Sequence, residues 1–106
     1  MVIPQAQVHE TEFASAVEEL ERVLAPEVVR LRYSLGEDWT GEPAVFFRVI
    51  LSDAVVSRRD RLGQFVNDIS FTVHMQLEPV EKWGVLPYYH YRSQAEQAQM
   101  KDPAWT

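Results

Sequence analysis

The sequence contains no cysteine, and this absence excludes disulfide bonds, thiolate metal sites and a cysteine nucleophile. It also lacks a long apolar run, because the longest uninterrupted one, residues 44–47, ends at Arg48. A membrane-spanning helix needs about 20 apolar residues. Residues 1–8 have neither the positive start nor the apolar stretch of a signal peptide. We therefore expect a soluble, cytoplasmic protein with no membrane partner.

Positive charge is scarce as well. The net charge is −6, and residues 1–27 carry six glutamates and one arginine. Affinity for nucleic acid comes from Lys and Arg side chains that neutralise phosphates, so this balance argues against nucleic-acid binding. We interpret the acidic start first as a solvated helix face, and second as a patch for a basic partner.

Signatures of catalysis and metal binding are missing too. His9, His74 and His90 lie far apart, and no H-E-x-x-H spacing supports a zinc site. The chain has neither a G-x-S-x-G elbow nor a phosphate-binding glycine loop. The sequence therefore predicts no catalytic residue, no metal and no cofactor.

The length of 106 residues predicts a single domain over 1–106, with residues 1–10 and 102–106 as poorly ordered tails. Apolar residues spaced three and four apart predict two amphipathic helices. The first follows Thr11, its expected N-cap, and the second covers residues 58–77, with Ser57 as its expected cap.

Three stretches are typical of strands. Residues 28–35 alternate between apolar and polar side chains, and residues 44–52 are apolar on both faces. The loop between them is too short for a crossover helix, so they should form an antiparallel hairpin. Residues 85–92 are aromatic and contain Pro87, which indicates an edge strand. A capping box at residues 93–96 predicts a short final helix.

The predicted element order is αββαβα, and the fold class is α+β. Its simplest architecture has two layers, a three-stranded mixed sheet with the helices packed on one face. If the second and third strands are parallel, the long helix is their crossover. The other sheet face is then exposed, and an apolar and basic surface of this kind favours association. Its candidate residues are Arg30, Arg32, Phe46, Arg48 and His90.

The loop between the first two strands is a candidate site for a ligand or a protein partner, because binding residues often lie on loops held by a rigid scaffold. Its alternative interpretation, which the sequence alone favours, is a plain polar hairpin loop with Trp39 folded onto the sheet edge. The candidate residues are Glu37, Asp38, Trp39 and Glu42.

Three other residues fall outside the expected patterns. Phe71 and Met75 lie off the apolar stripe of the long helix, one turn apart. They are either isolated surface residues or part of an interface. Arg48 interrupts an apolar strand, and a buried arginine needs a partner. It either points to the open face or pairs with the acidic loop or Asp53.

Residues 28–53 carry a faint family resemblance. A strand, a turn containing Ser34 and Gly36, an acidic loop, and a strand ending in Ser52 and Asp53 resemble the core of minimal nucleotidyltransferases from bacterial toxin–antitoxin pairs. The paired aspartates that hold Mg²⁺ in that family are absent from the second strand. The resemblance therefore implies a catalytically inactive relative that acts as a binding partner.

The first functional hypothesis is a non-enzymatic protein-interaction module, either a homodimer or a binder of one protein partner. It could be antitoxin-like, or an accessory protein of a bacterial gene pair. The alternative is a small enzyme or ligand-binding protein that uses the acidic loop 37–42 with Arg48 and His90, the histidine serving as a general base.

Overall fold

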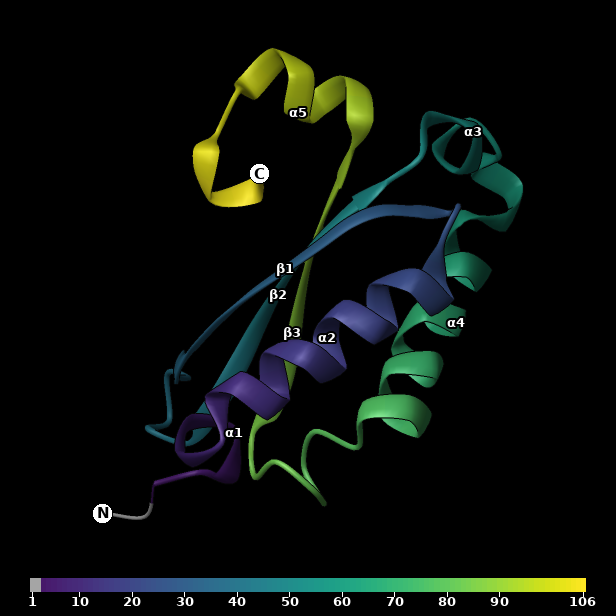
Figure 1. Ribbon diagram of the computed structural model, residues 1–106. Coiled ribbons are helices and arrows are strands. Elements are labelled where there is room, and N and C mark those ends of the chain that lie inside the picture. The colour runs from purple at the N-terminus through teal and green to yellow at the C-terminus, as the bar shows by residue number, and fades with distance from the viewer. Residues whose placement is uncertain (1–2) are drawn as a thin grey trace.

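The computed structural model describes residues 3–106, which form a sheet with helices before, between and after its strands (Figure 1). The elements are α1 (Gln5–Val8), α2 (Glu10–Leu24), β1 (Val28–Glu37), β2 (Pro43–Leu51), α3 (Asp53–Val56), α4 (Arg59–Leu77), β3 (Leu86–Ser93), α5 (Gln94–Met100) and the 3-10 helix η1 (Pro103–Trp105). The predicted α+β class and the mixed three-stranded sheet are confirmed.

The strand order is β1-β2-β3, with β2 in the centre. β1 and β2 form the predicted antiparallel hairpin, in which Tyr33 lies opposite Phe47. β2 and β3 run parallel, and Phe47 lies opposite Tyr89. Because parallel neighbours need a long connection, α4 links the end of β2 to the start of β3, as predicted.

The core lies between the sheet and the two long helices. α2 and α4 pack side by side on one face of the sheet (Figure 1). Phe47 of β2 is fully buried there, as is Phe13 of α2. The ring of Phe13 meets those of Tyr33 and Trp83 edge-on, with centroids 5.0 Å and 5.1 Å away. The apolar stripe predicted for α2 is therefore the one that is buried.

Two helix starts differ from the sequence prediction. α2 begins at Glu10, before Thr11, because the amide of Phe13 already donates to the carbonyl of His9. Ser57 does not cap α4, since its hydroxyl donates to the carbonyl of Ala54 and closes α3. The capping box at the start of α5 is formed as predicted.

Both ends of the described chain make contacts with the rest of the molecule, and the expectation of poorly ordered tails stays a prediction, with residues 1 and 2 outside the described residues. α1 forms within residues 1–10, and the amide of Ala6 donates to the carbonyl of Trp83 at 3.1 Å. Near the other end, Trp105 is buried. Both ends contact residues that are distant in sequence, so no local sequence pattern predicts these contacts.

The face of the sheet opposite α2 and α4, here called the outer face, is only partly open. The C-terminal segment, residues 94–106, lies on this side (yellow in Figure 1), and η1 contacts β2. Ile50 of β2 points to this face and is nonetheless buried. The prediction of a fully exposed face is therefore wrong, because the segment that follows β3 turns back over it.

Replacing Phe47 by Ala should lower the free energy of unfolding by about 3–5 kcal/mol, since the ring is fully buried at the centre of the core. Urea denaturation measures this change. The matched control is Phe71→Ala, which removes an exposed ring from α4 and should change stability by less than about 0.5 kcal/mol. Equal effects of the two substitutions would contradict this assignment of the core.

Candidate functional site

The loop between β1 and β2 is organised around the side chain of Asp38. Its Oδ1 atom accepts hydrogen bonds from the amide and the hydroxyl of Thr40, at 2.9 and 2.6 Å, and from the amide of Glu42 at 3.0 Å. Its Oδ2 atom accepts from the hydroxyl of Tyr88 on β3 at 2.7 Å. Gly41 has a φ of +86°, which favours glycine. The loop is thus closed on itself and tied to the sheet.

These hydrogen bonds lower the pKa of Asp38 to about 2, with the Thr40 hydroxyl as the largest cause and the Tyr88 hydroxyl next. The hydrogen bond between Tyr88 and Asp38 also raises the pKa of Tyr88. A carboxylate with so low a pKa is poorly matched to proton abstraction near neutral pH. Asp38 therefore acts as a structural acceptor in this loop.

The closed loop presents Trp39 to solvent. The side chain of Trp39 is 91% exposed, the largest value among the exposed apolar residues of the described chain. Glu37 and Glu42 beside it are exposed as well. The alternative in which the indole folds onto the sheet edge is therefore wrong, because Asp38 and Thr40 hold the backbone in a turn that points it outward.

On the outer face, strand pairing arranges the candidate residues in rows. Arg32, Arg48 and His90 form one row across β1, β2 and β3, and Ser34, Phe46 and Tyr88 form the next. The rings of Phe46 and Tyr88 stack with centroids 5.6 Å apart.

Arg48 points to the outer face, where neutral groups bind it. Its Nε atom donates to the carbonyl of Ala104 at 2.7 Å, its Nη1 atom to the hydroxyl of Ser34 at 2.7 Å, and its Nη2 atom to the carbonyl of Tyr33 at 3.1 Å. Within residues 3–106 no carboxylate forms an ion pair with it. The proposed pairing of Arg48 with the acidic loop or with Asp53 is therefore wrong. Asp53 instead accepts a hydrogen bond from the amide of Ala95.

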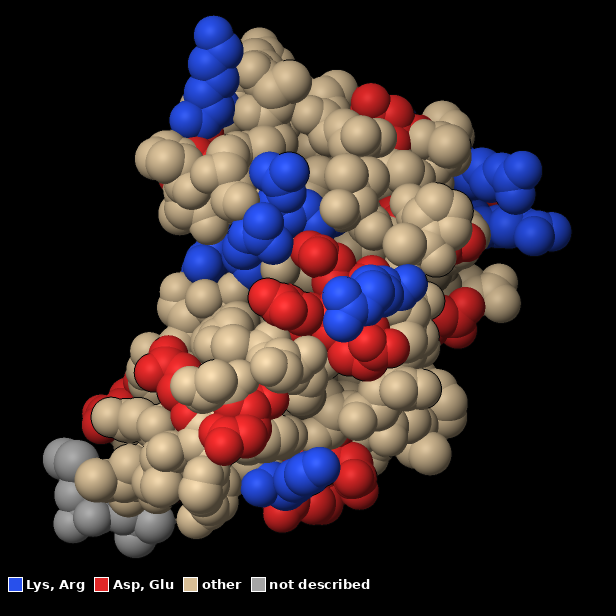
Figure 2. Space-filling view, viewed as in Figure 1, with Lys and Arg blue, Asp and Glu red and all other residues tan. Residues whose placement is uncertain are grey.

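The other arginines of the outer face lie near the C-terminal segment. Arg32 pairs with Glu21 at 3.2 Å and also donates to the main-chain oxygen of Thr106. Arg92 lies 3.6 Å from a carboxylate oxygen of Asp102, with its guanidinium over the Trp105 ring. Figure 2 shows Lys and Arg atoms gathered beside this segment, whereas Asp and Glu atoms gather over α2. Arginines therefore gather where the C-terminal segment meets the outer face.

The structure brings together some of the predicted site residues and separates others. Phe46, Arg48 and His90 lie on one face, as the strand alternation indicated. Phe71 and Met75 are exposed on α4 as predicted, in the helical layer of the molecule. Asp38 bonds to Tyr88 rather than to the arginine or the histidine, and the alternative of a small enzyme or ligand-binding protein stays a prediction.

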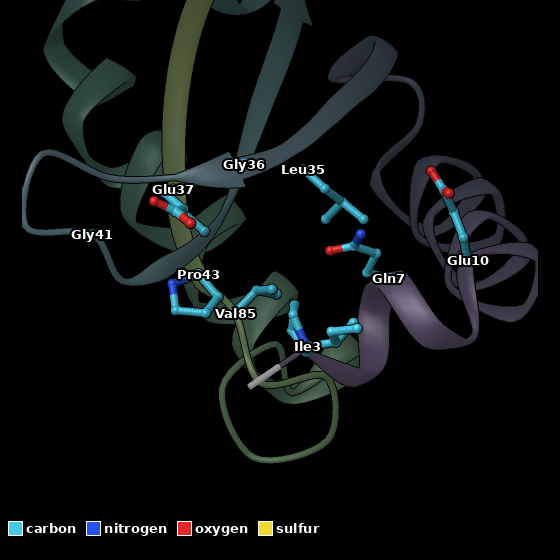
Figure 3. Close-up of a pocket in the computed structure, with 11 residues that line it drawn as sticks. Ile3, Gln7, Glu10, Leu35, Gly36, Glu37, Gly41, Pro43 and Val85 are labelled. Atoms are coloured by element: carbon cyan, nitrogen blue, oxygen red, sulfur yellow. The ribbon is translucent and has the colours of Figure 1, made fainter. Parts of the chain in front are cut away.

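A cavity of about 720 Å³ lies between α1 and the β1–β2 hairpin. Leu35 and Gln7 approach one another across it, with Glu37 at one side and Glu10 at the other (Figure 3). Its charged groups are carboxylates only, and its wall includes Ile3, the first residue described.

Searches for familiar features give no assignment. In residues 3–106 no three potential ligand side chains gather as a metal site would require, and no helix is long and apolar enough to cross a bilayer. Comparison with protein-family models, curated proteins and solved structures finds no significant match to this chain. The resemblance of residues 28–53 to the minimal nucleotidyltransferases thus stays a prediction.

Replacing Tyr88 by Phe should raise the pKa of Asp38 from about 2 toward the ordinary value, because one of its hydrogen bonds is lost. A carboxyl titration by NMR measures this shift. Because the pKa of Asp38 is lowered in the folded protein, its hydrogen bonds should hold the loop fully above about pH 4. They should be lost as the pH falls toward 2. Tyr89→Phe on the opposite face is the control and should leave the titration of Asp38 unchanged. A midpoint near 4 in the wild type would contradict the hydrogen bonding described here.

Proposed function

We propose that this chain is a protein-interaction module that engages its partner with Trp39. The observation that carries the proposal is the 91% exposure of this indole on a loop that Asp38 holds closed. A large apolar ring gains free energy from leaving water, yet the loop holds this one away from the core. Exposed tryptophan is among the residues most enriched at binding hot spots.

The order of the loop supports this function energetically. Binding costs free energy when flexible side chains and loops must be ordered in the complex. Here the turn is already fixed by the Thr40 and Glu42 contacts to Asp38, and Tyr88 ties it to the sheet. The loop that carries Trp39 is therefore already ordered in the free protein, and binding requires less further ordering.

The partner remains open between a second copy of this chain and a different protein, including the product of a neighbouring gene in a bacterial pair. The exposed glutamates beside Trp39, Glu37 and Glu42, favour a binding pocket with a basic rim, since complementary charge directs association. Phe71 and Met75 form a second apolar spot on α4, exposed by 65% and 59%. They offer an interface for self-association that is separate from the loop.

Trp39→Ala should weaken the complex by at least about 2 kcal/mol, roughly 30-fold in Kd, because a hot-spot indole is lost. Light scattering detects a homodimer, and affinity capture followed by titration with the purified captured protein measures a heterologous complex. Met100→Ala is the control, since it removes an exposed apolar side chain from α5, outside the loop and outside the Phe71–Met75 spot. The proposal fails if the wild-type chain neither dimerises nor binds a protein, or if Trp39→Ala binds as tightly as the wild type.

A further inference from the structure

We propose that the uncovered part of the outer sheet face binds an acidic segment of a partner protein. Arg48 and His90 would contact its carboxylates, and the Phe46–Tyr88 stack would contact its apolar side chain. This inference rests on the proposed role in protein binding, but it concerns a surface other than the Trp39 loop.

The surface, here called the outer strip, consists of Ser34, Phe46, Arg48, Tyr88 and His90. Its two limits are fixed by hydrogen bonds, at one end from Tyr88 to Asp38 of the loop and at the other from Arg48 to Ala104 of the C-terminal segment. Ser34 and His90 are exposed, whereas the aromatic pair and Arg48 are half-buried. The strip is therefore a half-buried aromatic surface with the guanidinium of Arg48 at one end.

Arg48, the guanidinium of the strip, forms no ion pair within the described chain. The three acceptors of Arg48 are two carbonyls and a hydroxyl, although a guanidinium has five N–H donors. Asp38, the loop carboxylate that reaches the strip, accepts its four hydrogen bonds from Thr40, Glu42 and Tyr88 and none from Arg48. A carboxylate brought by a partner would give Arg48 a charge-assisted hydrogen bond, which is stronger than those to neutral groups.

A second copy of this chain is a poor occupant of the strip. In a two-fold dimer the same patch faces itself, so the arginine pair Arg32 and Arg48 would face the same pair of the second copy. Like charges placed opposite one another in an interface oppose binding. Docking of the acidic α2 face on the strip would instead be head-to-tail, which builds rings or filaments.

A nucleic acid is also a poor occupant. The net charge of −6 repels a phosphate backbone at long range, and the acidic atoms over α2 lie close to the basic patch (Figure 2). A short acidic peptide carries fewer charges than a nucleic-acid backbone and is repelled less by the same net charge, and its apolar residue matches the stacked rings. The chemistry of the strip therefore favours a short acidic segment with an aromatic or aliphatic residue.

The test is selection from a random 12-residue peptide library displayed on phage, with the full chain as target. Selected peptides should be enriched in Asp and Glu together with an aromatic or aliphatic residue. Their Kd should rise at least tenfold in Arg48→Gln and in His90→Glu. The second variant guards against a folding artefact, because His90 is exposed and its change leaves the contacts of Arg48 with the C-terminal segment in place.

Matched controls on the helical layer are Arg59→Gln and His74→Glu, which change exposed residues of the same types on α4. They should leave peptide affinity unchanged. The proposal is overturned if selection yields no binders, if the binders are not acidic, or if His90→Glu binds them as well as the wild type. It is also overturned if single-stranded DNA binds the strip in preference to the peptides, or if Arg48→Gln abolishes oligomers of the wild-type chain.

The two proposals can fail separately. Trp39→Ala tests the loop, and it should leave the selected acidic peptides bound, since Trp39 is not part of the outer strip. If Trp39→Ala abolishes binding of a natural partner while His90→Glu leaves the affinity for the selected peptides unchanged, the loop proposal survives and the strip proposal fails. The reverse pattern would retain the strip and remove the loop.

Discussion

The central position of β2 is the constraint on which the rest of the structure depends. β2 is paired along both edges, so its alternate side chains are fixed toward the helical core or toward the outer face. Phe47 thereby anchors the core, while Phe46 and Arg48 are sent to the opposite side. A shift of one residue in this register would exchange the two sets.

The outer face has a different physical character because no helix of the α2–α4 layer covers it. Its arginines are satisfied mostly by main-chain oxygens and a hydroxyl, with Glu21 and Asp102 supplying the carboxylates at the margins. The C-terminal segment buries Ile50 and Trp105 at one end. The other end stays accessible beside the loop, whereas the arginines of this face gather where the C-terminal segment meets the sheet.

The loop shows how one side chain can create a surface. Asp38 satisfies two amides and two hydroxyls, and in doing so it fixes the turn, ties it to Tyr88 and leaves Trp39 with no protein surface to cover it. A flexible loop of the same composition could fold its indole back onto the sheet. The geometry of a single carboxylate thus produces the exposure of Trp39 on which the proposed binding role depends.

By itself the sequence determined the pattern of the fold. The alternation along β1 and β2, the apolar stripes of α2 and α4 and the capping box of α5 follow from side-chain periodicity and local hydrogen bonding, which act over a few residues. Only the tertiary structure decided what Arg48 meets, since its partner Ala104 lies 56 residues away. The same holds for Asp38 and Tyr88, 50 residues apart. Such contacts depend on how the C-terminal segment and β3 pack on the sheet, and no local pattern encodes that packing.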